Sequence, residues 1–426
     1  MNTSTNYLEQ YDAAPDADKF PLVRRWIDTE PLPFFKELRA KRPILVTPTC
    51  TLVTRFDDVR EILKMYKVFT VKPYVPKMAN YLMMHDDDAL HTREKSLMQF
   101  MLNRDDLPRV RAMVGDISRA ILAKANGQIE IVNEFCRMVP ATLVQDYFGL
   151  TGAKKEDLIE WSYWNQYDTF HNHPFDLLPA ELSQQIIDRH NETSKKLGSY
   201  ITMLIAKRLF AVKAEKLTFS TIIRLRDDIV TRMLRTSFAK ELDFDIQRLG
   251  TNAGGLLIGA IETTSQAVAQ VLNYLFQHPE WLTAAKTAAQ KEDTAEFDGI
   301  VWEALRFVPI TPYLFRIAAS DYAAAKGTGH ETVLRAGTYV LPVTLSAMFD
   351  ERAFDSPDSF IPQRNWYNYF HFGFGNHECL GRYVGMVMIP EMVRQVLLRK
   401  DVEQKGSMDY KSGPFPESYL LSWTVQ

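Results

Sequence analysis

The sequence predicts a mainly α fold with a small β portion. Apolar residues recur with helical periodicity through most of the 426 residues, and Pro and Gly interrupt the pattern between segments. The longest periodic segment runs from about residue 244 to residue 278, directly before Pro279. Strand patterns occur only in two short regions. Because no Pro/Gly/Ser-rich linker and no repeat divides the chain, we expect a single domain over residues 1–426.

The strands follow from local patterns taken in chain order. Apolar runs at Pro43–Val46 and Cys50–Thr54 predict two short strands near the N-terminus. Asp57–Leu63 comes next, and its acidic start before a helical pattern predicts an N-capped helix. Further strands are expected at Thr332–Leu334 and Thr338–Val343, on either side of a turn that contains glycine. The β portion is therefore small.

The long periodic segment 244–278 would span about 50 Å as one helix, which is long for a globular protein. In its middle, residues 259–264 place an acid, Glu262, and two hydroxyls in an apolar stretch. A solvent-facing polar stripe is one interpretation, but apolar residues surround these positions on several sides. The Thr263 hydroxyl can bond the carbonyl four residues back, on Gly259, which loosens the helix and opens a groove.

Composition excludes several classes of function. The chain is 46% hydrophobic and 24% charged with a net charge of −3, which is ordinary for a soluble globular protein. We expect no nucleic-acid partner, because no single-sign tract or basic face is visible. The polar, acidic start lacks a signal pattern, and no apolar run is long enough for a membrane anchor. These features predict a cytoplasmic protein.

The three cysteines, Cys50, Cys136 and Cys379, are odd in number and far apart. This pattern fits a reducing compartment better than a disulfide framework. A cysteine-ligated iron–sulfur cluster needs four thiolates, and the chain has no spare length for a flavin domain. If the protein is a redox enzyme, its electrons must therefore come from another protein.

Cys379 lies in the most informative stretch of the chain, His371–Arg382. Gly373, Gly375 and Gly381 surround it at fixed offsets, and glycine permits positive φ and close approach of backbone N–H groups. A helical pattern begins directly after the cysteine, at Leu380, so the sulfur lies at a helix N-terminus where its anionic form is favoured. A buried structural cysteine is the alternative. The glycines favour a metal-bound thiolate.

The order Phe372-x-x-Gly375-x-x-x-Cys379-x-Gly381 resembles the haem-binding signature of the cytochrome P450 family, the haem-thiolate monooxygenases. His377, two residues before the cysteine, is common in bacterial members. The resemblance extends from about residue 50 to residue 398 and implies the cytochrome P450 fold. It also implies that Cys379 is the metal ligand of a haem b group, with Phe372, Gly373, Gly375, His377 and Gly381 around the cofactor.

Further motifs resemble the same family in the same order. Residues 259–264 resemble its oxygen-binding motif, with Glu262 as the acid and Thr263 as the alcohol, and these two would serve protonation. Ala260 stands where glycine is more usual. Glu303, Arg306 and Arg364 match positions that form a buried charge network behind the cysteine loop.

The haem propionates need cationic or hydrogen-bonding partners. The segment from His91 to Lys95 resembles a family motif in which an arginine is usual at the last position. Lysine can neutralise a propionate but cannot bind it with two parallel hydrogen bonds, so Arg93 is a competitor. Arg316 and His377 match the remaining propionate positions.

The resemblance implies a monooxygenase that inserts one atom of O2 into a small molecule by hydroxylation or epoxidation, with electrons from a ferredoxin and a ferredoxin reductase. A peroxide-driven peroxygenase or a haem-thiolate isomerase is the alternative, although Glu262 and Thr263 argue against it, and a haem sensor is a third class. The segments expected to line the cavity are rich in Phe, Tyr, Met, Pro and Leu, which favours a mainly apolar substrate. They are residues 68–84, 163–178, 308–315 and 414–419.

Other features are less specific. Asp86–Asp88 is expected to cap a helix rather than to bind a metal. His171 and His173 lack a third ligand at useful spacing. The basic stretch Leu197–Arg235 fits either a lid or a contact with an acidic group. Pro390 is expected to kink the helix that follows the cysteine.

Overall fold

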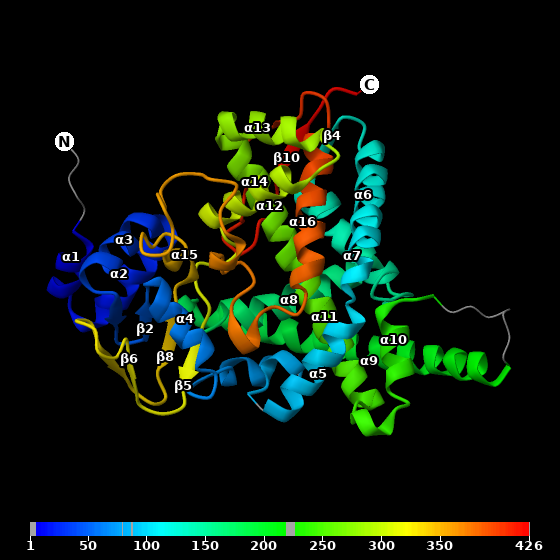
Figure 1. Cartoon of the computed structure of the whole chain (residues 1–426), viewed down its shortest axis with the longest axis horizontal. Helices are drawn as coiled ribbons and strands as arrows, with labels where there is room; N and C mark the ends of the chain where they lie inside the picture. Colours follow the sequence, from blue (N-terminus) through cyan, green and yellow to red (C-terminus); the bar gives the residue numbers. More distant parts are fainter. Residues whose placement is uncertain (1–5, 79, 87, 219–225, 426) are drawn as a thin grey trace.

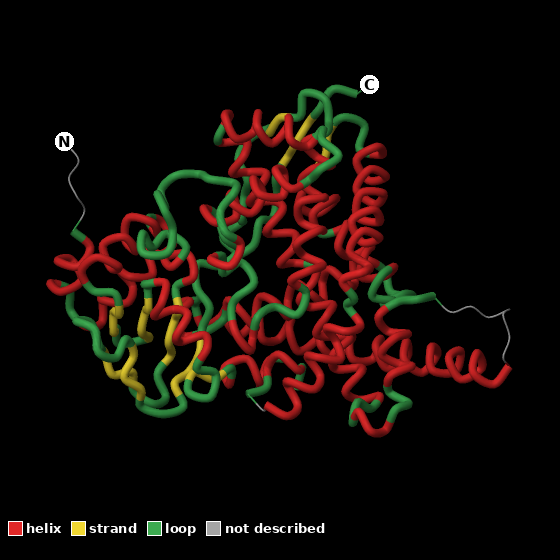
Figure 2. Tube along the Cα trace, viewed as in Figure 1, coloured by secondary structure: helices red, strands yellow, loops and turns green. Residues whose placement is uncertain are grey.

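The computed structural model describes residues 6–78, 80–86, 88–218 and 226–425. Helices form most of this part of the chain, and the strands are short (Figures 1 and 2). The predicted mainly α architecture with a small β portion is confirmed.

The helices differ widely in length. Residues 219–225, which include Arg224 of the basic stretch, lie outside the described residues, so neither interpretation of that stretch can be followed there. The helices are α1 (Tyr7–Ala13), α2 (Asp16–Thr29), α3 (Pro31–Lys41), α4 (Phe56–Lys64), α5 (Asp88–Met101), α6 (Leu107–Lys124), α7 (Met138–Asp146), α8 (Lys155–His171), α9 (Ala180–Thr218), α10 (Ile229–Thr236), α11 (Ile246–Ala260), α12 (Glu262–Gln277), α13 (Pro279–Ala289), α14 (Ala295–Phe307), α15 (Thr344–Ala347) and α16 (Arg382–Leu397).

Short helical turns connect these elements. Two of them, η1 and η2, cover part of the cavity described below, and η8 belongs to the cysteine loop. The turns are η1 (Lys72–Lys77), η2 (Leu82–Met84), η3 (Arg104–Asp106), η4 (Val132–Cys136), η5 (Pro174–Asp176), η6 (Lys240–Leu242), η7 (Trp366–Asn368) and η8 (Gly375–His377).

The largest sheet has five strands in the order β1-β2-β8-β5-β3 and lies beside the N-terminal helices (Figure 1). The two predicted early strands are confirmed, and β2 pairs antiparallel with β1 and parallel with β8. The parallel pair brings distant parts of the chain together. The strands are β1 (Ile44–Val46), β2 (Cys50–Val53), β3 (Phe69–Thr70), β5 (Arg316–Ala318) and β8 (Tyr339–Pro342).

Two smaller sheets complete the β portion of the described chain. The strand predicted at residues 332–334 is confirmed as β7, which pairs with β6 and does not join the largest sheet. Near the C-terminus, β10 lies between β4 and β9. The strands are β4 (Gln128–Glu130), β6 (Tyr322–Ala324), β7 (Thr332–Leu334), β9 (Glu403–Gln404) and β10 (Leu420–Ser422).

Helix α4 begins within one residue of its predicted start but is capped differently. Its N-cap residue, Arg55, makes no side-chain capping bond. Instead, the Phe56 N–H donates to the Asp350 carboxylate at 2.9 Å. The acceptor comes from a distant segment, so local sequence could not indicate it.

The long segment predicted as one helix is two helices. Ile261, with φ −85° and ψ −65°, separates α11 from α12. The side chain of Asp245 caps the start of α11 by accepting from the Arg248 N–H at 2.8 Å. The helical periodicity continues across Ile261, which is why the sequence pattern alone did not reveal this break.

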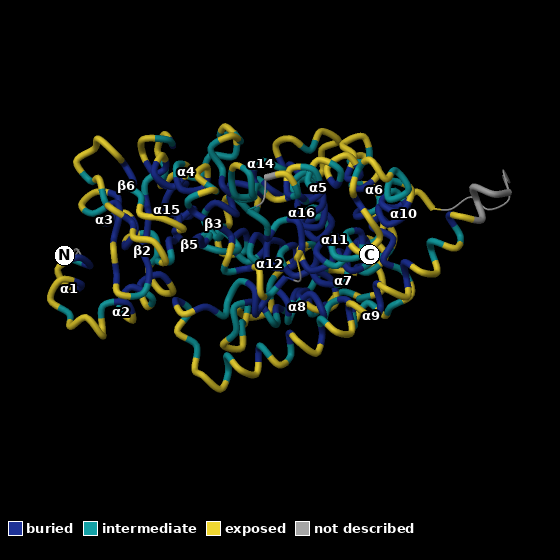
Figure 3. Tube along the Cα trace, turned by 90° about the horizontal axis from the view of Figure 1, so that it is seen from below, coloured by how far each residue is buried: buried dark blue, intermediate teal, exposed yellow. Residues whose placement is uncertain are grey.

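Helix α16 follows the cysteine loop and begins at Arg382, two residues after the predicted start. It continues through Pro390 as one element to Leu397. In Figure 3, α11, α12 and α16 run through the buried interior, whereas the exposed residues lie mainly on outer helices and loops. The cysteine loop is thus attached to one of the best-buried helices of the described chain.

Candidate active site at the cysteine loop

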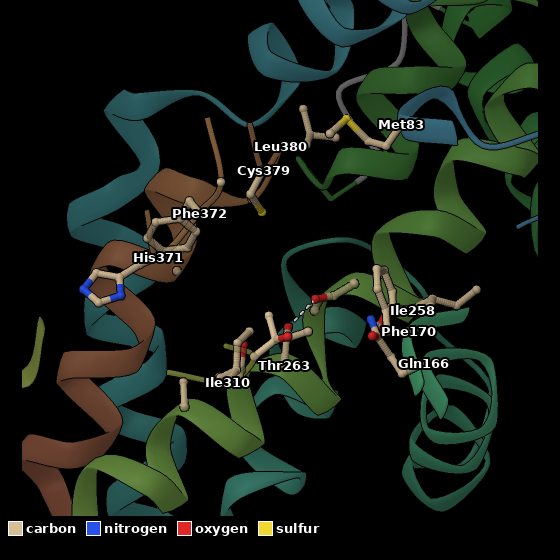
Figure 4. A pocket seen from close by; sticks show the side chains of 18 of the residues that line it. Met83, Gln166, Phe170, Ile258, Thr263, Ile310, His371, Phe372, Cys379 and Leu380 are labelled. Atoms are coloured by element: carbon tan, nitrogen blue, oxygen red, sulfur yellow. Dashed lines mark hydrogen bonds between the residues drawn. The ribbon is translucent and has the colours of Figure 1, made fainter. Parts of the chain in front are cut away.

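Cys379 lies between η8 and α16, and its side chain opens into a cavity (Figure 4). The Cys379 N–H donates to the Phe372 carbonyl at 2.8 Å, which closes the loop. The backbone N–H of Gly381 donates to the sulfur. The loop therefore holds the sulfur at a fixed point on the cavity wall.

Two of the three loop glycines have the expected positive φ. Gly373 has φ +72° and Gly375 has φ +75°, and a Cβ on Gly375 would lie 3.0 Å from the Leu63 carbonyl oxygen. Gly381 differs, because its φ is −80° and its ideal Cβ position is 3.8 Å from the Cys379 sulfur. The absence of a side chain at Gly381 keeps space free beside the sulfur.

Burial raises the pKa of the Cys379 thiol above its ordinary value. The Gly381 N–H and the nearby Lys95 charge act in the opposite direction but do not outweigh burial. The predicted preference for the anionic sulfur therefore does not come from the protein alone. A metal cation bound to the sulfur would supply the charge that favours the thiolate.

The cavity has a volume of about 330 Å³ and extends from the cysteine loop to the break between α11 and α12. Thr263 lies on its far side, and the predicted hydrogen bond from its hydroxyl to the Gly259 carbonyl is present at 2.6 Å (Figure 4). The wall is mainly apolar. Its members include Val71, Tyr74, Met78, Met83, Met84, Leu143, Phe170, Leu256, Pro309, Ile310 and Leu314.

Three of the four segments expected to line this cavity do so, namely residues 68–84, 163–178 and 308–315. Residues 414–419 are not among the described residues that line it. Instead, Phe415 packs with Tyr167 and Ile186 in a separate small hydrophobic cluster. The C-terminal segment thus supports α8 rather than the cavity itself.

The wall of the cavity includes one unusually close helix contact. Tyr81, which precedes η2, packs directly against α11 at Gly255. A Cβ on Gly255 would lie only 2.3 Å from the tyrosine ring. Glycine is therefore required at this position for the tyrosine to keep its place.

Glu262 does not face the same way as Thr263. Its side chain is fully buried, and Arg137 donates to its two oxygens at 2.9 and 3.0 Å. Arg137 also pairs with Glu417 at 3.2 Å. Burial raises the pKa of Glu262, and the Arg137 charge only partly opposes this effect. Glu262 is absent from the described lining of the cavity, and sequence reasoning gave no signal for Arg137 or Glu417.

Two histidines at the edge of the cavity lack hydrogen-bond partners within the described part of the chain. His91 on α5 is fully buried, and its ring centroid is 4.8 Å from that of His377. All four ring nitrogens are buried without a hydrogen bond, and Asp86 approaches His377 only to 3.7 Å. Burial, with the nearby His377 charge, lowers the pKa of His91 to about 4.

The basic residues predicted for the propionates differ in position. Lys95 donates to the carbonyls of Asn376 and Glu378 at 2.6 and 2.8 Å, so it ties α5 to the cysteine loop. Arg316 on β5 is buried and lines the cavity. Arg93 instead pairs with Asp243 at 3.1 Å. The geometry therefore favours Lys95 over Arg93 as the residue closer to the cysteine loop.

The structure brings Glu303, Arg306 and Arg364 into one cluster. Arg306 donates to both Glu303 oxygens at 2.7 and 3.0 Å, and Arg364 donates to one of them at 3.0 Å. The Tyr369 hydroxyl, which sequence reasoning missed, donates to Glu303 at 2.7 Å. Burial alone would raise the pKa of Glu303, but the contacts with Arg306 outweigh this effect and lower it. The cluster connects α14 to the segment that leads into the cysteine loop.

No metal site is found among the described residues at the acidic run 86–88 or at His171 and His173. The ring of His173 bonds the Thr169 carbonyl at 2.8 Å, and His171 packs against Phe415. Asp86 accepts from the Val71 N–H at 3.0 Å, and α5 begins at Asp88. Asp87 lies outside the described residues.

These residues fit a haem group. The Cys379 sulfur faces the cavity from a glycine-shaped loop and is available to bind a metal, and Thr263 lines the same cavity. The unpaired ring nitrogens of His91 and His377, together with the buried Arg316 guanidinium, are suitable donors for two carboxylates. Buried ring nitrogens without a hydrogen-bond partner are otherwise costly to a fold.

Residues 45–418 match the cytochrome P450 family. The chain therefore belongs to the cytochrome P450 family, and membership implies a haem–iron cofactor. PikC, a cytochrome P450 monooxygenase of Streptomyces venezuelae, is 26% identical over 87% of this chain and 84% of its own. The erythromycin C-12 hydroxylase of Saccharopolyspora erythraea is 27% identical over 77% of this chain and 76% of its own.

Solved structures confirm the predicted fold. The structure of CYP109E1 from Bacillus megaterium with testosterone aligns with a TM-score of 0.75 at 17% identity, over 97% of this chain and all of that one. P450BioI, solved with an acyl carrier protein that bears hexadec-9Z-enoic acid, gives a TM-score of 0.76 at 19% identity, over 94% and 100%. Among the described helices, none is long and apolar enough to cross a membrane.

Proposed function

We propose that this enzyme is a haem-thiolate monooxygenase that inserts one oxygen atom of O2 into a mainly apolar small molecule, by hydroxylation or epoxidation. The observation that carries the proposal is that Cys379 and Thr263 line one apolar cavity from opposite sides. The relatives support the reaction class, since they include a protein named as a hydroxylase and one named as an epoxidase.

In this proposal the cofactor is haem b, bound through the Cys379 sulfur. The Gly381 N–H would stabilise the thiolate, and His91, His377, Lys95 and Arg316 would hold the propionate side. Phe372, Gly373 and Gly375 would shape the loop beneath the ring. The bound haem would supply oxygen activation, which an axial thiolate favours by donating electron density.

Glu303, Arg306 and Arg364 would act as a brace for this loop. Their contacts are buried and charge-assisted, and Arg306 also donates to carbonyls of the segment that precedes the loop, at Pro357 and Ser359. Charge-assisted bonds are the strong ones. We infer that the brace fixes the position of the sulfur and hence haem retention.

We assign proton control to Thr263 and Glu262. The Thr263 hydroxyl lies at the cavity wall, where its bond to Gly259 fixes its orientation. Glu262 lies next to it in sequence, and burial raises its pKa, which suits a carboxyl that takes up and releases protons. Because Arg137 holds Glu262, proton delivery would require that ion pair to loosen.

The substrate is inferred to be mainly apolar because the cavity wall is rich in Met, Phe, Tyr and Leu side chains. Testosterone in CYP109E1 and the fatty acyl chain in P450BioI are ligands of those proteins, and both are largely apolar. We further propose that a ferredoxin and its reductase supply the electrons, since the chain has only three cysteines.

The decisive test compares turnover driven by electrons from ferredoxin and reductase, turnover driven by peroxide, and a control with neither. Haem-loaded protein is first reduced under carbon monoxide, where a thiolate-ligated spectrum is expected and a nitrogen-ligated one would contradict the role of Cys379. A panel of lipophilic compounds is then screened for shifts of the haem absorption band. The best binders are incubated with ferredoxin and reductase, with peroxide, or with neither. Product is expected with ferredoxin and reductase. An equal amount of product with peroxide alone would favour a peroxygenase.

A variant separates proton control from binding. Thr263→Ala should retain haem and bind the same compounds, but more of the electrons should appear as hydrogen peroxide. The fraction of electrons found in product is the measurement. An unchanged fraction would remove Thr263 from the mechanism, whereas loss of haem would assign it a structural role.

A further inference from the structure

Helix α8 is joined to the break between α11 and α12 by two side chains. Ser162 donates from its hydroxyl to the Ile258 carbonyl at 3.0 Å, and Gln166 donates to the same oxygen from its Nε2 at 2.8 Å. Both side chains are buried. They lie one helical turn apart, so one face of α8 holds a single carbonyl of α11.

The carbonyl that α8 holds is next to the one that Thr263 holds. Ile258 and Gly259 are consecutive, and both accept side-chain hydrogen bonds just before the interruption at Ile261. Side chains that bond helix carbonyls perturb the regular ladder. The local geometry of this groove is thus set partly by α8 and partly by Thr263.

Gln166 also reaches the cavity. It belongs to the cavity lining together with Phe170, and both lie across the cavity from Cys379 in Figure 4. A carbonyl oxygen can only accept, so the Gln166 amide must turn its N–H toward Ile258, and this fixes the orientation of the group. Its Oε1 accepts no hydrogen bond from the described residues and remains available as an acceptor.

We propose that Gln166 is a positioning residue that couples ligand binding to the groove, and that the preferred ligand is an apolar small molecule with one hydroxyl or N–H donor. A donor from the ligand would pair with Oε1. Because hydrogen bonds at the two ends of an amide polarise one another, this bond strengthens the one from Nε2 to Ile258. A bound ligand then holds the Ile258 carbonyl in place, next to the Gly259 carbonyl that accepts from Thr263.

The inference rests on the proposed function of the same cavity, but it can fail independently. Ser162 keeps α8 attached when Gln166 is changed, so the variants should fold. Gln166→Leu removes both the donor and the acceptor at nearly constant volume. Phe170→Leu changes the same wall without touching Ile258 and is the matched control. Ser162→Ala leaves the amide in place.

The probes are 1-dodecanol and its isomer methyl undecyl ether, of which only the alcohol has a hydrogen-bond donor. In haem-loaded wild type, titration of the absorption band should show about tenfold tighter binding of the alcohol, which corresponds to one buried hydrogen bond. Gln166→Leu should abolish this preference by weakening the alcohol only. Phe170→Leu and Ser162→Ala should keep it. Equal affinity in wild type, or no binding of either probe, would overturn the assigned ligand class.

Hydrogen exchange tests the coupling itself. In wild type the alcohol should slow amide exchange in residues 258–264, the ether should have less effect, and Gln166→Leu should respond equally to both. A merely structural glutamine would change the baseline exchange but not its dependence on the ligand. Failure of the proposed function would appear separately, as absence of product with ferredoxin and reductase while these binding differences persist.

Discussion

The two walls of the cavity are held together by different kinds of contact. Behind the cysteine loop, Glu303 is fully buried and accepts from two arginines, a tyrosine and a backbone N–H. On the opposite wall, α8 is joined to α11 by neutral bonds to one carbonyl. A buried charge cluster resists any displacement, whereas neutral bonds can be exchanged at lower cost. The comparison indicates a fixed wall at the cysteine loop and an adjustable wall where α8 meets α11.

The largest effect is expected from the fixed wall. Glu303→Gln leaves Arg306 and Arg364 buried without their carboxylate, which should cost about 3–5 kcal/mol of folding stability. Haem should be lost during purification as the loop loosens. The haem-to-protein ratio and the urea midpoint are the measurements. Glu296→Gln, an exposed position on the same helix, is the control and should change neither; a stable, haem-replete Glu303→Gln protein would contradict the brace.

A change in the adjustable wall should alter how fast ligands enter the cavity and should leave the haem content of the protein unchanged. Lys77 on η1 donates to the carbonyls of Asp168 and Asn172 and to the Asp168 carboxylate, at 2.7–3.1 Å, and so fastens η1 to the end of α8. Lys77→Met should weaken this closure by about 1–3 kcal/mol. Stopped-flow binding of 4-phenylimidazole should become about tenfold faster. The exposed Lys72→Met is the control, and an unchanged rate would show that η1 does not limit entry.

His173, which follows α8, should give the protein a distinct pH dependence. Burial lowers the pKa of His173 to about 4, whereas the unfolded chain titrates near 6.5. Between these values the unfolded state binds the additional proton, so stability is lost as the pH falls from 6.5 to 4. Relative to His173→Gln, which keeps an N–H donor for Thr169, wild type should lose about 1.4 kcal/mol more per pH unit. Urea unfolding at pH 7 and pH 5 measures this, and parallel curves would contradict it.

The smallest effects on haem content and stability are expected for two residues on α5, Arg93 and Lys95. Arg93 pairs with the exposed Asp243, and such pairs contribute less than about 1 kcal/mol. Arg93→Gln should therefore leave haem content and stability nearly unchanged. Lys95→Gln should release two carbonyls of the cysteine loop and lower haem retention. Haem titration of both apo-variants makes the comparison, and the reverse order would return the propionate role to Arg93.

The sequence allowed prediction of features that depend on near neighbours. Three such features are the glycine loop around Cys379, the bond from Thr263 to Gly259 and the pair of Glu303 with Arg306. Within each of them, the interacting residues are only a few positions apart in the sequence. Their spacing on a helix or a tight turn determines the contact. The family signature then indicated the fold.

The contacts that could not be predicted join distant segments. Arg137 meets Glu262 across 125 positions, and Gln166 meets Ile258 across 92. No local periodicity encodes which helix faces which, so these partners emerge only from packing. The break at Ile261 was missed for a related reason, because an isoleucine continues the apolar pattern while the backbone departs from it.

The contact between Tyr81 and α11 has a consequence for how this enzyme could acquire new activities. Because the ring occupies the space that a methyl group at residue 255 would need, a single added carbon there must move the tyrosine. The roof over the bound compound would shift with it. Residue 255 is thus a place where selection, natural or in the laboratory, can resize the chamber without changing the cysteine loop.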